Sequence, residues 1–167
     1  MQPERNGPFE SWIIGYGNPQ RRDDGIGPYI VGRLNKQLKQ RADIRFRILH
    51  QLEPALVEDL RYADSIVLVD ATTNRLRDGW ECAEIKPESG RIPYTTHHFD
   101  PAFMLALLYS IYHRSPQTWL ASVQGDDFGF GEGLTPEAEK RANKAVLEIV
   151  KLMATKEIDK RDESVKL

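Results

Sequence analysis

The sequence has almost no cysteine: Cys82 is the one thiol in 167 residues. A single cysteine excludes an intramolecular disulfide and any zinc site that needs several thiolates. We therefore expect folding to need neither a disulfide nor a structural metal ion. The composition is consistent with a reducing cytosol. We interpret Cys82 as an ordinary buried residue rather than as a nucleophile.

Long apolar runs are also missing, and so is an excess of charge of either sign. No stretch of 18 apolar residues could span a membrane, and the segment Met1–Gly7 lacks the apolar stretch of a signal peptide. Lys and Arg number 23 against 25 Asp and Glu, which gives a net charge of −2, and the basic residues are scattered. We therefore expect a soluble cytoplasmic protein whose partners include neither nucleic acid nor a membrane.

Three familiar catalytic motifs are absent. The sequence contains no His-Glu-x-x-His pair of a metalloprotease helix, no Gly-x-Ser-x-Gly nucleophile elbow and no Gly-Lys-Ser/Thr end of a phosphate-binding loop. These absences argue against the three kinds of catalytic site that the motifs mark.

The length fits one domain, which can bury roughly 70% of the surface that the unfolded chain exposes. No internal repeat, low-complexity block or linker interrupts the sequence. We expect an N-terminal extension over residues 1–10, a single α/β domain over residues 11–155, and a charged, frayed tail over residues 156–167.

Strands and helices are expected to alternate along the chain. Five segments have the length and composition of strands: 11–17, 44–49, 65–70, 80–86 and 117–123. Four helices are expected from apolar spacing and start signals, namely one just after Asp24, one from Pro54 to about residue 61, one from Asp100-Pro101 and one from Thr135-Pro136. This order predicts a three-layer α/β/α sandwich with a five-stranded, mostly parallel or mixed sheet, in which the more polar 80–86 segment forms an antiparallel edge strand.

An apolar strand pattern breaks into a polar, glycine-punctuated segment that carries two adjacent carboxylates. The segment runs Ile13-Ile14-Gly15-Tyr16-Gly17-Asn18-Pro19-Gln20-Arg21-Arg22-Asp23-Asp24-Gly25-Ile26-Gly27. Its glycines permit backbone approaches that a Cβ would obstruct. Asp23 and Asp24 would stand at a helix N-terminus, where one of them could cap the helix or could serve a site at the strand end.

Asp70 ends the third expected strand, and Asp24 follows the first. Because the carboxyl ends of parallel strands lie at one edge of a sheet, both carboxylates could face the same crevice. If the helix that begins at Asp100 returns its N-terminus there, His97 or His98 would complete a set of two oxygen ligands and one imidazole. Such a set can bind a borderline divalent ion and leave coordination positions open.

Four short landmarks occur in order along residues 11–150. They are Gly15-Tyr16-Gly17-Asn18 continuing to Asp23-Asp24-Gly25-Ile26-Gly27, then Val67-Leu68-Val69-Asp70-Ala71, then Thr95-Thr96-His97, and last Gly133-Leu134-Thr135-Pro136-Glu137. Together they make the chain resemble the hydrogenase maturation endopeptidases, which trim the C-terminus of the large subunit of nickel-containing hydrogenases. The resemblance covers nearly the whole expected domain and implies a peptide hydrolase.

The resemblance also implies a site and a substrate. Asp24, Asp70 and His97 would occupy the positions of the family's catalytic, metal-contacting residues, with His98 as the less favoured substitute for His97. The metal would be nickel already installed in the partner, a hydrogenase large-subunit precursor, so that no cofactor is permanently bound. Two carboxylates and a neutral imidazole would complete the shell of a nickel ion partly held by substrate cysteines, and proteolysis would become conditional on the metal.

Two alternative functions use the same segments. One is a non-enzymatic, metal-dependent binding or checkpoint protein that recognises its partner in the same crevice without cutting it. The other is a hydrolase like the peptidyl-tRNA hydrolases, whose opening resembles Gly15-Tyr16-Gly17-Asn18-Pro19. That family next has a Thr-Arg-His-Asn segment, whereas this chain has Arg21-Arg22-Asp23-Asp24 and so lacks the expected catalytic histidine.

Several other residues near these segments are given structural interpretations. We expect Arg21 and Arg22 to be solvated or paired with nearby acids. The glycine-rich segment Gly125–Gly133 is interpreted as a plain connection. His50 and His113, which lack a comparable partner pattern, are interpreted as structural or exposed.

Overall fold

The computed structural model describes residues 9–87 and 99–165, with side chains as far as Thr155. Within these residues the elements are β1 (Ser11–Tyr16), η1 (Arg22–Gly25), α1 (Ile26–Gln37), β2 (Ile44–Leu49), α2 (Leu56–Asp59), η2 (Leu60–Tyr62), β3 (Ser65–Thr72), β4 (Trp80–Ile85), α3 (Pro101–Tyr112), β5 (Gln117–Gln124) and α4 (Pro136–Val165). The two η elements are short 3-10 helices. In this part of the chain, every helix lacks the length or the apolar character that a membrane crossing requires.

The five strands form one mixed sheet in the order β2-β1-β3-β5-β4. Neighbours among β2, β1, β3 and β5 are parallel, and β4 runs antiparallel to β5 at one edge. The predicted mixed sheet and the antiparallel edge strand over residues 80–86 are therefore confirmed. The carboxyl ends of the four parallel strands lie together at one end of the sheet.

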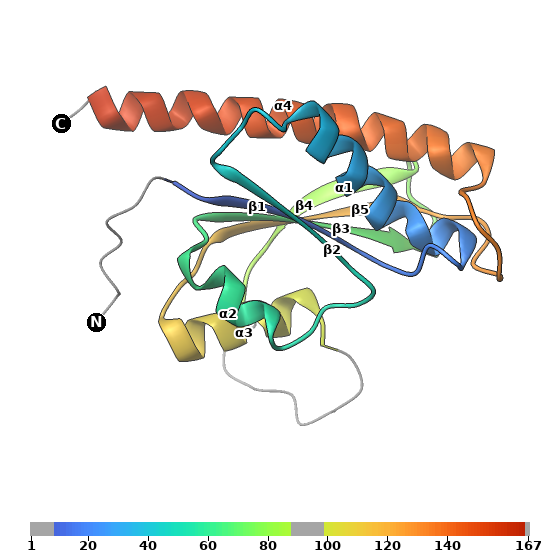
Figure 1. Cartoon of the computed structure of the whole chain (residues 1–167), viewed down its shortest axis with the longest axis horizontal. Coiled ribbons are helices and arrows are strands. Elements are labelled where there is room, and N and C mark those ends of the chain that lie inside the picture. Colours follow the sequence, from blue (N-terminus) through green and yellow to red (C-terminus); the bar gives the residue numbers. More distant parts are fainter. Residues whose placement is uncertain (1–8, 88–98, 166–167) are drawn as a thin grey trace.

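Helices cover both faces of this sheet (Figure 1). α1 and α4 lie on one face, and α2 and α3 lie on the other. Ile13 and Val67 belong to the core under α1 and α4, whereas their neighbours Ile14 and Leu68 belong to the core under α2 and α3. This alternation arises because successive side chains of a strand point to opposite faces. The predicted three-layer α/β/α sandwich is confirmed.

Two predicted helix starts are confirmed as well. Asp100 is the N-cap of α3, where its Oδ1 accepts a hydrogen bond from the N–H of Phe103 at 2.8 Å, and Pro101 is the first helical residue. Pro136 is the first residue of α4 and follows Thr135. Proline suits this position because the first N–H of a helix has no partner within the helix.

Two details differ from the sequence predictions. α4 continues to Val165, past residue 156, and residues 156–165 contain no glycine or proline that would end a helix. Cys82, which was predicted to be buried, is exposed because β4 lies at the edge of the sheet and most of its residues face solvent. The division into extension, domain and tail stays a prediction.

The first turn of α1 lies against the sheet at a distance that only glycine permits. A Cβ on Gly27 would stand 2.5 Å from the carbonyl oxygen of Tyr16 and 2.6 Å from that of Val69. A Cβ on Gly32, in the same helix, would meet no heavy atom of the described residues within 4 Å beyond its chain neighbours and the adjacent helix backbone. The close approach at Gly27 therefore holds α1 against β1 and β3, next to the loop that carries the two acids.

We predict that Gly27→Ala lowers the free energy of unfolding by about 1–3 kcal/mol, because the new methyl group overlaps two backbone carbonyls. Gly32→Ala should raise it by roughly 0.5–1 kcal/mol through helix propensity alone. Urea unfolding of both variants beside the wild type measures the difference. Equal stabilities for the two variants would contradict the close approach.

Candidate functional site

A pocket of about 490 Å³ lies at the carboxyl ends of β1 and β3. Asp24, from η1, and Asp70, from β3, both line it. Further walls come from the connection after β2 and from the N-terminus of α3, which contribute His50, Gln51, Leu52, Glu53, Pro54, Phe99, Asp100 and Pro101. The structure thus brings Asp24 and Asp70 to one crevice, and α3 directs its N-terminus to it as the sequence suggested.

Asp24 is held by the loop that leads into α1. Its Oδ2 accepts a hydrogen bond from the backbone N–H of Asn18 at 2.8 Å, and its own N–H donates to the carbonyl of Arg21 at 3.0 Å. Gly17 permits this fold-back, since its φ is +139° and a Cβ there would collide with the carbonyl oxygen of Asp24. The loop therefore closes on Asp24 and fixes its carboxylate at the pocket.

Asp70, near the carboxyl end of β3, is half-buried in the wall of the pocket. Burial raises the pKa of its carboxyl to about 6; hydrogen bonds from Tyr16 and the N–H of Ala71 oppose this rise, and the charge of Asp24 adds to it. The pKa of the Tyr16 hydroxyl is raised mainly by burial and secondly by the charge of Asp70. Tyr16 is therefore protonated at neutral pH and can donate a hydrogen bond to Asp70. A cation close to Asp70 would offset both its burial and the repulsion from Asp24.

Asp23 does not line the pocket and is completely buried beside it. Its two oxygens accept four hydrogen bonds, from the N–H groups of Asp126 (2.7 Å), Asp127 (3.0 Å) and Thr135 (2.7 Å) and from the Thr135 hydroxyl (2.8 Å). Burial by itself raises the pKa of Asp23, but these bonds together outweigh it, and the pKa lies below its ordinary value. Asp23 therefore ties the segment after β5 to the loop after β1.

The capping role considered for these acids is wrong. Gly25 is the N-cap of α1, and no side-chain hydrogen bond caps that helix. The 3-10 turn η1 stands between the acids and α1, so Asp23 turns toward the segment after β5 and Asp24 turns back to Asn18. The two adjacent carboxylates thus have different partners and different surroundings.

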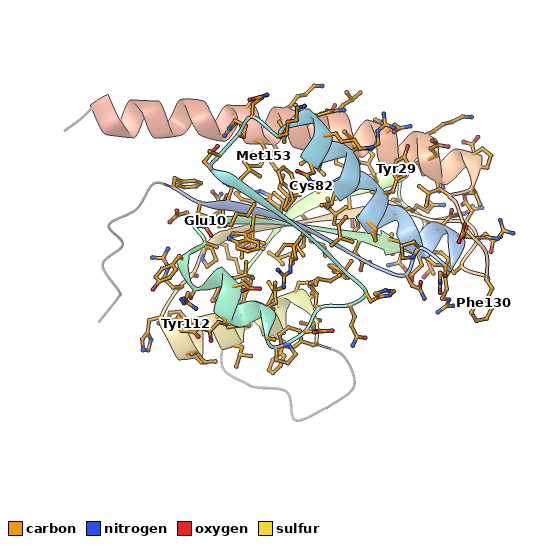
Figure 2. All side chains as sticks on the ribbon, in the orientation of Figure 1. Glu10, Tyr29, Cys82, Tyr112, Phe130 and Met153 are labelled. Atoms are coloured by element: carbon orange, nitrogen blue, oxygen red, sulfur yellow. The ribbon has the colours of Figure 1, made fainter. Side chains whose placement is uncertain are left out.

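Backbone contacts also join the loop between β1 and α1, residues 17–25 (the site loop), to the segment 125–133. The N–H of Arg22 donates to the carbonyl of Gly131 at 2.9 Å. The Arg22 side chain forms an ion pair with Asp127 at 3.2 Å, which confirms the predicted pairing with a nearby acid. The segment is therefore fixed to the site loop and is more than a plain connection, while Phe130 stands outward and is 90% exposed (Figure 2).

His97 and His98 lie outside the described residues, so their place relative to Asp24 and Asp70 stays a prediction. Among the described side chains, those of residues 9–87 and 99–155, no three of His, Cys, Asp or Glu come together in a group that could hold a metal ion. The third ligand predicted from the sequence, His97, lies outside the described residues.

Sequence reasoning did not assign Tyr16 or His50 to the pocket. Tyr16 lines it and donates to Asp70, and His50, which is exposed as expected, lines it too. Tyr16 ends β1 and His50 follows β2. Both could have been found by the same rule that pointed to Asp24 and Asp70, because each stands at the carboxyl end of a parallel strand.

The fold is similar to that of solved hydrogenase maturation proteases. The maturation protease HycI from Thermococcus kodakarensis KOD1 aligns with a TM-score of 0.67 and 21% identity over 89% of this chain and 95% of its own. The maturating endopeptidase HybD from E. coli aligns with a TM-score of 0.65 and 20% identity over 89% and 94%. The hydrogenase 2 maturation peptidase from Thaumarchaeota archaeon SCGC_AB-539-E09 gives 0.62 and 18% over 86% and 97%. Neither a family model nor a curated protein matches the sequence.

We predict that Asp23→Asn lowers the free energy of unfolding at pH 7 by about 2–4 kcal/mol, since an amide NH₂ would face N–H donors. Asp24→Asn, which loses one charged acceptor at the pocket, should cost less than about 1.5 kcal/mol. The folded pKa of Asp23 is depressed, so its contribution is present above the unfolded value, near 3.9, and is lost as the pH falls below it. A deficit of Asp23→Asn that is as large at pH 3 as at pH 7 would contradict this account.

We predict the opposite sign for Asp70→Asn. The folded pKa of about 6 exceeds the unfolded 3.8, so the ionised form is disfavoured by folding and stability falls as the pH rises through this interval. The variant without bound metal should therefore be more stable than the wild type at pH 7.5, by on the order of 1–2 kcal/mol, and about equal to it at pH 4. Thermal unfolding at the two pH values measures this, and a variant that is destabilised at pH 7.5 would overturn it.

Proposed function

We propose that this protein is an endopeptidase that removes a C-terminal peptide from a nickel-loaded hydrogenase large-subunit precursor. The observation that supports this best is that Asp24 and Asp70 line one pocket of a fold shared with hydrogenase maturation proteases. Three of the sequence landmarks that resemble this family meet here. Two of them contain the pocket residues Asp24 and Asp70. The third contains Thr135, which donates a hydrogen bond to Asp23, the residue before Asp24. The cytoplasmic location expected from the sequence belongs to this proposal.

Recognition of nickel follows from the chemistry of the donors. Asp24 and Asp70 would supply carboxylate oxygens and His97 an imidazole nitrogen, and a borderline divalent ion accepts both kinds of ligand. The ion would belong to the substrate and be held in part by substrate cysteines. A precursor without nickel would leave the two carboxylates facing each other without a cation, so binding in the cleavable position would depend on the metal.

Asp70 has a pKa suited to this task. At about 6, that pKa leaves the carboxyl mostly ionised at pH 7.5, and a nearby divalent cation would lower it further. The Tyr16 hydroxyl, protonated at the same pH, orients the Asp70 carboxylate by donating to it. A cation at this place would polarise the scissile carbonyl or lower the pKa of a bound water, and Asp24 and Asp70 would fix where it stands.

We predict that incubation with this protein shortens a nickel-loaded precursor by its C-terminal peptide and leaves a nickel-free precursor intact, as measured by intact-mass spectrometry. Asp24→Asn, Asp70→Asn and His97→Ala should each slow cleavage at least about 100-fold, because each removes a proposed metal contact. Asp78→Asn is the matched control, since Asp78 is exposed and does not line the pocket.

The outcomes separate the candidate functions. Nickel-dependent complex formation without a mass change would favour the non-enzymatic checkpoint protein. Normal cleavage by all three variants would overturn the assigned site. Asp70→Asn is especially informative, because a variant that is inactive and yet more stable than the wild type cannot owe its inactivity to unfolding.

A further inference from the structure

β2 forms the edge of the sheet beside the pocket. Among the described residues it pairs with β1 alone, in parallel register. The carbonyls of Asp43 and Leu49 accept hydrogen bonds from the N–H groups of Ser11 (2.9 Å) and Gly17 (3.1 Å) on the β1 side. The odd-numbered residues of this strand therefore direct their main-chain groups toward β1.

The opposite side of β2 carries the main-chain groups of Phe46 and Ile48. Main-chain N–H and C=O groups of alternate residues in a strand point to opposite sides, so the even-numbered residues face away from β1. The N–H of Ile44, which bonds to the carbonyl of Arg41 in the preceding turn at 3.3 Å, fits this parity. The edge thus presents one row of donors and acceptors in extended backbone.

The charged side chains of this edge are engaged elsewhere. Edge strands are commonly protected by charges, and Arg45 and Arg47 are exposed charges of this kind. Arg45 forms an ion pair with Glu10 at 3.1 Å, and Arg47 forms one with Asp59 of α2 at 3.4 Å. Ile48, between the charged part of the strand and the pocket, is apolar and 52% exposed.

The carboxyl end of the same edge opens onto the pocket. After β2 the chain enters the connection His50–Pro54, which leads to α2 (Figure 1) and lines the pocket together with Asp24 and Asp70. The other edge of the sheet is β4, and the described residues of β4 and β5 do not line that pocket. Of the two edges, β2 is therefore the one that continues into the pocket wall.

We propose that the free edge of β2 binds the C-terminal extension of the precursor as an added antiparallel strand. This inference rests on the proposed function. Under the proposed function, the part of the precursor before the cut would hold the nickel at the acids, so the extension after the cut is the segment that would pair with the edge. It would leave the pocket at the carboxyl end of β2, run toward the amino end, and bond through its main chain to Phe46 and Ile48.

Strand spacing sets which residues of the extension can pair. Neighbouring strands lie about 4.8 Å apart, so an added strand would stand roughly 10 Å from β1 and roughly 14 Å from β3, which carries Asp70. An extended chain advances about 3.3 Å per residue, so roughly three to four residues cross from the pocket to the edge. Pairing with β2 would therefore begin at about the fourth residue after the cut.

Two substitutions at one position separate the main chain from the side chain. Ile48→Pro removes the outward N–H, which takes no part in the pairing with β1, and proline is tolerated on edge strands. Ile48→Ala keeps the N–H and removes the apolar side chain. With the nickel-loaded precursor as substrate, we expect kcat/KM of Ile48→Pro to fall about tenfold below that of Ile48→Ala, mainly through a higher KM. Thermal unfolding of both variants controls for their stability.

The length of the extension provides a second arm of the experiment. A nickel-loaded precursor shortened to three residues after the cut cannot reach β2, so the two variants should cleave it with equal kcat/KM. If the wild type cleaves the precursor with the full extension and the two variants do so with equal kcat/KM, the proposed edge site is wrong, while the proposed protease function still stands. Failure of the wild type to cleave would overturn the proposed function and this inference with it.

Amide exchange in the wild type tests the same contact without any substitution. A synthetic peptide with the sequence of the extension should slow exchange of the Phe46 and Ile48 amides at least about tenfold in NMR spectra. The Arg45 and Arg47 amides, which already face β1, should change little. Absence of this alternation would overturn the proposal even if Ile48→Pro proved to be unfolded.

Discussion

The buried carboxylate of Asp23 is the interaction on which both the site loop and the last helix depend. It binds the segment after β5 through three N–H groups and one hydroxyl, and two of these four donors belong to Thr135, directly before α4. α4 and α1 together cover one face of the sheet, so this carboxylate links the loop that carries Asp24 to that helical layer. A charge at such depth is tolerated because four hydrogen-bond donors are directed at it.

A comparison of Asp23 with Asp70 explains why one acid supports the fold and the other suits a site. Asp23 is completely buried and yet has a lowered pKa, whereas Asp70 is less buried and has a pKa of about 6. The difference lies in the donors: four reach Asp23, while Asp70 receives the Tyr16 hydroxyl and one N–H and also faces Asp24. A carboxylate with few donors beside another acid lowers stability when it is ionised, and a cation would offset that cost.

The fold was predictable because its signals are local. Apolar runs mark the strands, Asp100-Pro101 marks the start of α3, and the parallel order alone places Asp24 and Asp70 at one end of the sheet. The role of Asp23 was not predictable, since Thr135 is 112 residues away and most of the donors are backbone groups that no side-chain pattern reveals. The exposure of Cys82 was missed for a related reason, because it depends on which helices cover β4 and how far.

The order of the strands would give the proposed substrate two separate places of contact. The acids stand at the ends of inner strands β1 and β3, whereas the free backbone belongs to the outer strand β2. A folded body can lie over strand ends, but a row of main-chain donors and acceptors accepts only an extended segment. The metal would therefore decide whether the scissile bond is held at the acids, and the extension would decide how long the precursor stays bound. Because the two contacts use different parts of the substrate, loss of the second would raise KM and leave the dependence on nickel unchanged.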